Sequence, residues 1–433
     1  MRWRNRFHDR FIAVPFAIIN LPVANQPLES IPSLAPVKDR IVHVEGAHAV
    51  VKSPSAALAP GNSAVKSWYV VNTSRWAELP EFVRTSGRVA DHVAGKFAVM
   101  QLDDAAVERL SADLHREGMA CGAIVRLGDT PVHAGSVTTP VPVKPVESEI
   151  ASVRAMAGQV DAGRIRATIE EMSKVTTRYH ATPSGVAVSD WLVSRYRELA
   201  GSRSDIEVTK FDHTAMNSRQ SSVVVRIKGV KSPDDLLILG SHIDSVNWND
   251  GTSQRSPGSD DNASGTATNL EIFRVLMNNG ARFDRTVEIH GYAAEEIGLV
   301  GSLHIANDYK VAGKRVIAMM QQDMNLYKEP GQPDKIWFVE ENTNAGFNDQ
   351  LAALVDRYVK VPWEKGSLTS GSSDHASWTR RGFPAAFPFE NPEAYNPHIH
   401  SADDDSSHAD AFSQSAAFGK LGLAYLAHFA GVN

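Results

Sequence analysis

The chain has one cysteine in 433 residues. A single thiol can form neither an internal disulfide nor a thiolate metal site, so cysteine content does not indicate a cellular compartment. Acidic residues outnumber lysine and arginine by 50 to 44, which gives a formal net charge of −6. This balance argues against a nucleic-acid partner, because phosphate binding needs clustered basic side chains. With 42% apolar and 22% charged residues, the composition is that of an ordinary globular protein.

The first residues combine a basic head with a short apolar run. Four arginines in the first ten residues precede the apolar stretch 11–24. This order resembles a secretory signal over residues 1–25, and the stretch is too short to anchor the chain in a bilayer. We therefore expect a secreted or periplasmic protein without a membrane anchor.

Residues 38–136 predict a small α+β domain. Its clearest helix is Ala105–Glu117, in which Val107, Leu110 and Leu114 fall on one face. Prolines are dense in the segment that follows, and residues 137–150 therefore predict an extended linker between two domains. Strands are expected at Arg40–Val44, Ser67–Val71 and Ala123–Leu127.

Residues 151–433 alternate strand and helix patterns. This alternation predicts an α/β fold with a mixed, mostly parallel central sheet flanked by helices. Functional sites in such sheets form beyond the carboxyl ends of the strands. Strands are expected at Ser222–Lys228, Leu236–Gly240, Val287–Tyr292, Val316–Met320, Ile336–Val339 and Ala385–Phe389, and helices at Ile165–Met172, Ser189–Leu199 and Thr268–Asn278.

Ligand-type residues follow several of these strands. His242 comes after one strand, and Asp244 shares its face in an extended chain, where it can accept a hydrogen bond from the second ring nitrogen. Asp261 lies before a predicted helix, and its two carboxylate oxygens suit a bridge between two cations. Asp323 follows a further strand and adds another oxygen ligand.

Two adjacent glutamates and a pair of histidines complete the pattern. Glu295 and Glu296 point in different directions, so one can bind metal while the other acts as general base. His398 and His400 lie two positions apart in one loop, and spacing does not choose between them. Imidazole and carboxylate ligands without thiolates suit two zinc ions, and they do not exclude cobalt or manganese.

Several segments carry a resemblance to a known family. They resemble the secreted bacterial leucyl aminopeptidases, which are dizinc exopeptidases of the aminopeptidase S/glutamate carboxypeptidase superfamily. The likeness extends from about Val160 to Phe429, and a segment similar to the family's last ligand segment favours His400 over His398. The segments are His242–Ser245, Gly258–Gly265, Ala293–Leu299, Gln322–Met324, Ser373–Trp378 and Tyr395–His400.

The resemblance implies a zinc-exopeptidase fold and a role for each site residue. His242 and Asp323 would hold one zinc ion, Glu296 and His400 the other, and Asp261 would bridge them. Glu295 would be the general base, Asp244 would orient His242, and the peptide between Asp261 and Asn262 would be cis. The residues implied for the apolar substrate pocket are Met324, Phe387, Phe389, Tyr395 and Ile399.

The implied function is removal of leucine-type residues from peptides with a free N-terminus, by a monomeric enzyme. Family members often carry a cysteine pair at positions that correspond here to Leu368 and Ser372, so the rim of the pocket differs. Residues 38–136 resemble the propeptide region of secreted peptidases, and a permanent accessory domain is the alternative interpretation.

Other functions on the same fold remain open. A glutaminyl cyclase would use a single zinc ion for a transferase reaction. A carboxypeptidase would need arginines for the substrate carboxylate, and Arg380 and Arg381 are the nearest candidates. A catalytically inactive binding domain would have lost metal ligands, whereas all of the expected ligand positions are present.

Overall fold

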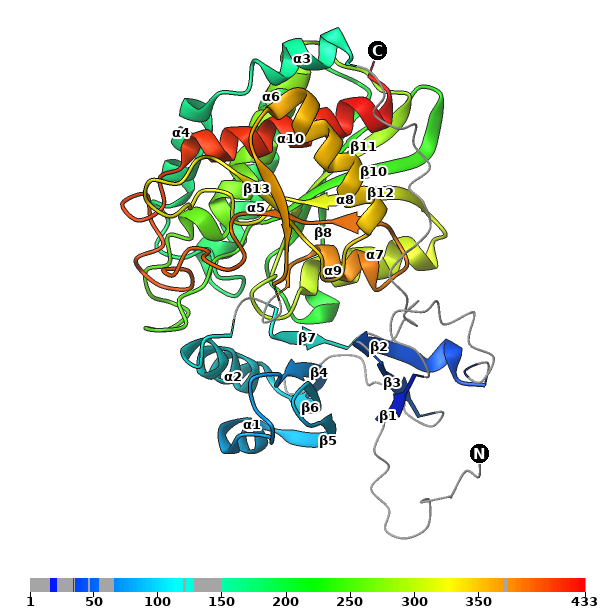
Figure 1. The fold of residues 1–433 in the computed structure, drawn as a ribbon, viewed down its shortest axis with the longest axis vertical. Helices are drawn as coiled ribbons and strands as arrows, with labels where there is room; N and C mark the ends of the chain where they lie inside the picture. Colours follow the sequence, from blue (N-terminus) through cyan, green and yellow to red (C-terminus); the bar gives the residue numbers. More distant parts are fainter. Residues whose placement is uncertain are drawn as a thin grey trace.

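The computed structural model describes residues 16–21, 34, 36–45, 47–53, 66–119, 122–127, 149–368 and 372–432. Figure 1 shows a large α/β domain with a smaller N-terminal part against one end. Cys121, nearly all of the expected linker and most of the signal-like segment lie outside the described residues. Within that segment, Phe16–Asn20 form strand β1, so this stretch belongs to the fold of the N-terminal part.

The large domain is built on a mixed sheet of six strands in the order β15-β12-β10-β11-β9-β8. The pairs β15-β12, β12-β10 and β10-β11 are parallel, and the pairs β11-β9 and β9-β8 are antiparallel. The predicted mixed, mostly parallel sheet is therefore confirmed. The strands are β8 Ile206–Phe211, β9 Ser222–Ile227, β10 Ser232–His242, β11 Arg285–Tyr292, β12 Arg315–Gln321 and β15 Ala385–Ala386.

Helices cover both faces of this sheet (Figure 1). Along β10, Leu237 and Leu239 point into the larger core, whereas Leu236 and Ile238 point into the core on the opposite face. The larger core contains side chains from α3 Ala151–Ala157, α4 Ala162–Met172, α5 Pro183–Ala200, α6 Gly265–Asn278, α8 Ala345–Leu354 and α10 Phe412–Ala430. The opposite face is covered by α7 Val300–Val311 and α9 His375–Thr379.

The predicted strand Ala385–Phe389 is two short strands that belong to different sheets. β15 extends the central sheet, while β16 Pro388–Phe389 pairs with β13 Ile336–Val339 in a small sheet that also contains β14 Trp363–Gly366. The carbonyl of Phe387 accepts the N–H of Val339 at 3.0 Å, and Pro388 has no N–H to continue a ladder. The chain therefore changes sheets at this point, beside the functional site.

The described residues of the N-terminal part form two antiparallel sheets and the helices α1 and α2. Helix α2 Asp104–Arg116 begins as expected, because the Asp103 side chain accepts the N–H of Ala106 at 2.9 Å. Strands β1 Phe16–Asn20, β2 Ile41–Glu45 and β3 His48–Lys52 form one sheet, and β4 Ser67–Asn72, β5 Arg88–Val93, β6 Phe97–Leu102 and β7 Ile124–Arg126 form the other, beside α1 Glu81–Ser86. None of the helices that the structure describes has the length and apolarity to cross a membrane.

Gly265, the first residue of α6, provides a test of the packing at this end of the sheet. A Cβ at this position would lie 2.1 Å from the carbonyl oxygen of Gln322, so we expect Gly265→Ala to destabilise the fold by about 1–3 kcal/mol. Gly346, near the start of α8, has its nearest such neighbour at 3.5 Å, and Gly346→Ala should stabilise by about 0.5–1 kcal/mol. Thermal unfolding measures both changes, and equal stability of the two variants would contradict this packing.

Candidate metal centre

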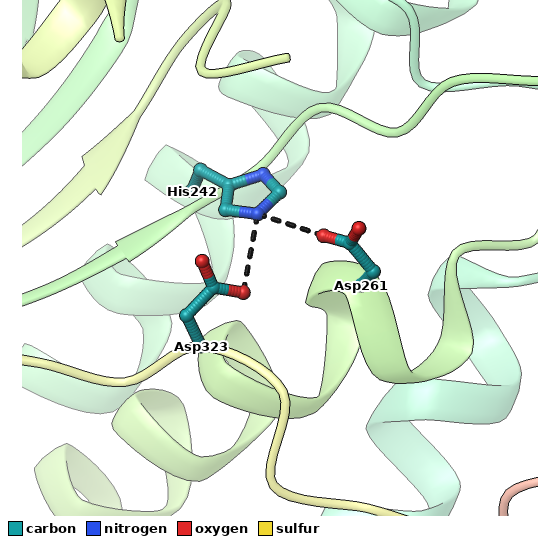
Figure 2. Close-up of side chains that lie close together, drawn as sticks. All are labelled: His242, Asp261 and Asp323. Carbon is teal, nitrogen blue, oxygen red and sulfur yellow. Dashed lines mark ion pairs between the residues drawn. The ribbon is translucent and has the colours of Figure 1, made fainter. Parts of the chain in front are cut away.

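The first group of ligand-type side chains lies beyond the carboxyl ends of β10 and β12. His242 ends β10, and its Nε2 lies 3.0 Å from Asp261 Oδ1 and 3.3 Å from Asp323 Oδ1. Figure 2 shows the two carboxylates pointing at this ring nitrogen, one from the turn before α6 and the other from the loop after β12. Their potential ligand atoms all lie within 4.8 Å of one another. This spacing suits a single bound metal ion.

A second group shares Asp261 with the first. His400 Nε2 lies 3.1 Å from Asp261 Oδ2 and 3.0 Å from Glu296 Oε2. The two oxygens of Asp261 thus face two different histidines. Such sharing of a carboxylate is the arrangement that a pair of metal ions requires.

The charge balance of the centre fits cations at these two places. Asp323 Oδ1 and Glu296 Oε1 are buried and accept no hydrogen bond from the described residues. Burial opposes protonation of His242, yet the nearby Asp323 carboxylate holds the His242 pKa well above its usual value. Against the same effect of burial, Glu296 raises the pKa of His400 to about 10. So many buried carboxylates are unfavourable unless positive charge compensates them, and divalent cations would supply that charge.

Backbone turns with positive φ bring these side chains together. Ala294, which precedes the glutamate pair, has φ 54°, and Met324, which follows Asp323, has φ 55°. His400 itself has φ 58°. Such values are uncommon for residues other than glycine and cluster where a fold aims side chains at a site. The peptide between Asp261 and Asn262 is cis, as the family resemblance implied.

Asp244 connects His242 to the glutamate pair. Its Oδ1 lies 3.4 Å from His242 Nδ1 and accepts the N–H of Glu295 at 3.1 Å. Its Oδ2 accepts the N–H of Glu296 at 3.2 Å. Asp244 is therefore placed to orient the imidazole, as its spacing predicted, and it also holds the backbone of both glutamates.

Glu295 is buried beside the ligands without a hydrogen-bonding partner among the described residues. Burial holds the pKa of its carboxyl group well above the usual value. His242 opposes this shift, whereas Asp374 and Glu296 reinforce it. A carboxyl group in this setting has free lone pairs and a raised proton affinity.

Buried carboxyl groups also hold the ligand loops in place from behind. Asp260 accepts the N–H of Leu326 at 2.8 Å, and Glu390 accepts the N–H groups of Tyr327 at 3.0 Å and Asn396 at 2.7 Å. These bonds tie the turn of Asp261, the loop after Asp323 and the loop of His400 to one another. Sequence analysis missed them because the partners are far apart along the chain.

The five expected pocket residues lie together next to Asp323. They line a small hollow, with Leu368 and Ser372 on its wall. Phe387 stacks on the buried ring of His375, with the ring centroids 4.6 Å apart. The lining is apolar or aromatic, which favours an apolar ligand group. The five are Met324, Phe387, Phe389, Tyr395 and Ile399.

Helix α2 of the N-terminal part lies against the metal centre. His115 Nδ1 is 3.2 Å from His400 Nδ1, and the Tyr179 hydroxyl donates to Glu108 at 2.7 Å. Sequence analysis did not find this contact, because a single histidine at a helix end carries no signal. The N-terminal residues Ser111, Leu114, His115, Met119, Gly122, Ala123 and Ile124 line one small cavity together with Trp248, Glu296 and His400.

Two alternatives from the sequence can now be compared. His398 is half-buried and lies against His408 with ring centroids 4.2 Å apart, whereas His400 faces Asp261 and Glu296. His400 is thus the histidine of this loop that reaches the centre. Arg381 is buried, and its guanidinium donates to Asn307 on α7 rather than facing the ligand groups.

These features are those of a candidate centre for divalent metal ions at the edge of an α/β sheet, with an apolar pocket beside it. The sequence profile of Peptidase family M28 matches residues 222–422, which include all five ligand-type residues. Together with the relatives that follow, this match shows that the chain belongs to peptidase family M28. It is an enzyme of the peptidase class.

Aminopeptidases are similar to this chain both in sequence and in structure. Leucine aminopeptidase 1 of Fusarium vanettenii is 32% identical over 291 residues, which cover 64% of this chain and 72% of the relative. A probable aminopeptidase of Saccharomyces cerevisiae is 33% identical over 252 residues, which cover 57% and 67%. The crystal structure of the LapA aminopeptidase of Legionella pneumophila superposes with a TM-score of 0.72 at 25% identity, covering 86% of this chain and 99% of that one.

The two histidines of the last loop provide a direct test of the centre. We expect His400→Ala to reduce bound zinc by about one ion per chain, because the second ligand group loses its imidazole. His398→Ala, in the same loop, should bind as much zinc as the wild type. Elemental analysis after dialysis measures the metal content, and the reverse result would assign the ligand role to His398.

Proposed function

We propose that this chain is a metal-dependent aminopeptidase that removes leucine and similar large apolar residues from the N-termini of peptides. The observation that carries this proposal is the pair of ligand groups that share Asp261 beside an apolar pocket. The relatives add support, since the Fusarium protein is named as a leucine aminopeptidase and LapA as an aminopeptidase.

In this proposal the five ligand-type residues hold two zinc ions. His242 and Asp323 would hold one, Glu296 and His400 would hold the other, and Asp261 would serve both. Such ions, when bound, polarise the scissile carbonyl and lower the pKa of water. Cobalt or manganese would suit the same donors.

Glu295 acts as the general base of the proposed reaction. It takes a proton from the attacking water and returns it to the leaving amine. Its burial, its free carboxylate oxygens and its raised pKa support this role. Asp244 holds the ring of His242 and the backbone of Glu295 in the required orientation.

The pocket beside Asp323 receives the side chain of the first residue of the substrate. Its apolar lining favours leucine-type side chains over charged ones, because a charged group buried there would lose its hydration without a partner. The peptide's free amine binds at the metal centre, which restricts cleavage to the chain end. Leu368 and Ser372, in place of the family's cysteine pair, form part of the pocket wall.

Two rival activities receive less support. A glutaminyl cyclase reaction needs one zinc ion, whereas two complete ligand groups are present here. A carboxypeptidase needs a cationic partner for the substrate carboxylate, and the guanidinium of Arg381 is already engaged with Asn307 on α7. Both observations favour a dinuclear aminopeptidase.

The N-terminal part acts as a cover over the centre in the proposed cycle. The contact between His115 and His400 supports this, because peptide substrate must approach the same side of the ligands. Residues 38–136 then correspond to a propeptide, residues 137–150 to the linker that is cut, and residues 151–433 to the catalytic domain. We also propose secretion from the basic and apolar segment 1–25, and cleavage after this segment would remove β1 from its pairing with β3.

Glu295→Gln tests the general base. We expect kcat for leucine p-nitroanilide to fall about 10²–10⁴-fold, because the amide cannot accept the proton of water. Zinc content should match that of the wild type, which excludes loss of metal as the cause. N-acetyl-leucine p-nitroanilide should resist the wild-type enzyme, and its cleavage at an equal rate would rule out an aminopeptidase.

Cutting the linker tests the cover. With a specific protease site inserted between residues 137 and 148, we expect cleavage and removal of the N-terminal fragment to raise kcat/KM at least about tenfold. The uncut protein with the same insertion is the control. Tyr179→Phe, which loses the hydrogen bond to Glu108, should raise the rate of the uncut protein slightly. An unchanged rate after removal of the fragment would identify an accessory domain instead.

A further inference from the structure

Arg178 is a fully buried cation directly behind the metal centre. It lies between α4 and α5, and none of the described carboxylates forms an ion pair with it. Its guanidinium donates to backbone carbonyls instead. Nε donates to Ile243 at 3.1 Å, Nη2 donates to Gly258 at 2.9 Å, and Nη1 donates to Pro257. One side chain therefore holds two separate stretches of backbone.

Both stretches carry a proposed ligand. Ile243 follows His242 directly, and the turn that begins at Pro257 and Gly258 leads to Asp261. The backbone N–H of Arg178 also donates to the hydroxyl of Ser245 at 3.1 Å, on the first stretch. Arg178 thus fixes the distance between the backbone of His242 and the backbone of Asp261.

The turn before Asp261 needs such side-chain partners. Residues Ser259–Ser264 are buried, and Asp261 and Asn262 have non-helical φ and ψ values, so regular helical hydrogen bonds do not satisfy the whole turn. Gly258 has φ 49°, and a Cβ there would lie 2.7 Å from Arg178 Nη2. The glycine leaves the space through which the guanidinium reaches the turn.

Asp404 holds the same turn through the N–H groups that follow Gly258. Its Oδ1 accepts the N–H of Asp260 at 3.1 Å, and its Oδ2 accepts the N–H of Asp261 at 3.0 Å. Arg178 takes carbonyls at the start of the turn, while Asp404 takes N–H groups next to the bridging carboxylate. The two side chains together satisfy a backbone that secondary structure leaves incomplete.

We infer that Arg178 and Asp404 are positioning residues that set the geometry of Asp261 for simultaneous binding of two metal ions. Asp261 must direct one oxygen toward His242 and the other toward His400, at 3.0 and 3.1 Å. A site of this kind tolerates displacements of only about 0.5 Å. The inference rests on the proposed metal centre and deepens it.

Charge and geometry have opposite effects here, which makes the inference testable. Burial lowers the pKa of Arg178 to about 10, against the influence of Asp404, Asp244 and other nearby carboxylates, so the side chain stays positive near neutral pH. A positive charge by itself repels metal cations. Loss of charge alone would therefore tighten zinc binding, whereas loss of position would weaken it.

The experiment measures the zinc affinity of the full chain by competition with a chromophoric chelator. Arg178→Lys keeps the charge but cannot reach three carbonyls, and Arg178→Met removes both charge and donors. We expect both variants to bind zinc about 10–100-fold more weakly than the wild type. Asp404→Asn, which places an amide N–H₂ against a backbone donor, should weaken binding to a similar degree.

Arg381→Lys is the matched control. Arg381 is also fully buried in the same domain, but its guanidinium donates to Asn307 on α7 rather than to the ligand loops. We expect it to bind zinc as the wild type does, even if its melting temperature falls. Melting temperatures without zinc, measured for all variants, separate a general loss of stability from a loss of metal binding.

Each remaining outcome decides one question. Wild-type zinc affinity in Arg178→Lys and Asp404→Asn would overturn the positioning role, and tighter binding in Arg178→Met would show that the arginine acts through charge alone. An equal loss in Arg381→Lys would overturn it as well. If Arg178→Lys does not fold, Asp404→Asn decides the question. A wild-type chain that binds no zinc would instead refute the proposed metal centre itself.

Discussion

The structure depends on one carboxylate that is shared between two histidines. Asp261 directs its two oxygens to His242 and His400, and both rings lie in a buried setting rich in acidic groups. Such a concentration of buried negative charge is unfavourable unless cations compensate it. The raised pKa values of both histidines have the same cause, because the nearby carboxylates favour positively charged groups. The fold around the centre can be understood as the means of holding these charges at fixed distances.

The parallel arrangement of β10, β11 and β12 places most of these charged groups at fixed distances from one another. Neighbouring parallel strands end at the same edge, so His242, the glutamate pair and Asp323 emerge close together. The cores on both faces of the sheet keep the strand ends in register. The turn of Asp261 and the loop of His400 come from outside the sheet. They need side-chain contacts instead, which Arg178, Asp404 and Glu390 supply.

The sequence predicted what depends on local pattern. Strand-like runs located β10, β11 and β12, and the shared apolar face of Val107, Leu110 and Leu114 located α2. Three of the expected ligands, His242, Glu296 and Asp323, meet because they follow neighbouring parallel strands. The split of Ala385–Phe389 between two sheets was not predicted, because a short apolar run does not reveal its pairing partners. The positive φ values of Met324 and His400 could not be predicted either, because these residue types usually have negative φ.

Contacts between segments that are distant along the chain could not be predicted from the sequence for a different reason. Arg178 lies 79 and 80 residues from the carbonyls of Pro257 and Gly258 that it binds, and His115 lies 285 residues from His400. Neither residue stands in a motif, and each would pass for a surface side chain in its own segment. The burial of Arg178 and the contact of His115 with His400 follow only from the assembled fold. Residues that complete a site therefore can lie far from its ligands in sequence, on elements that carry no catalytic group. Unusual burial of a charged side chain is then the structural sign of their role.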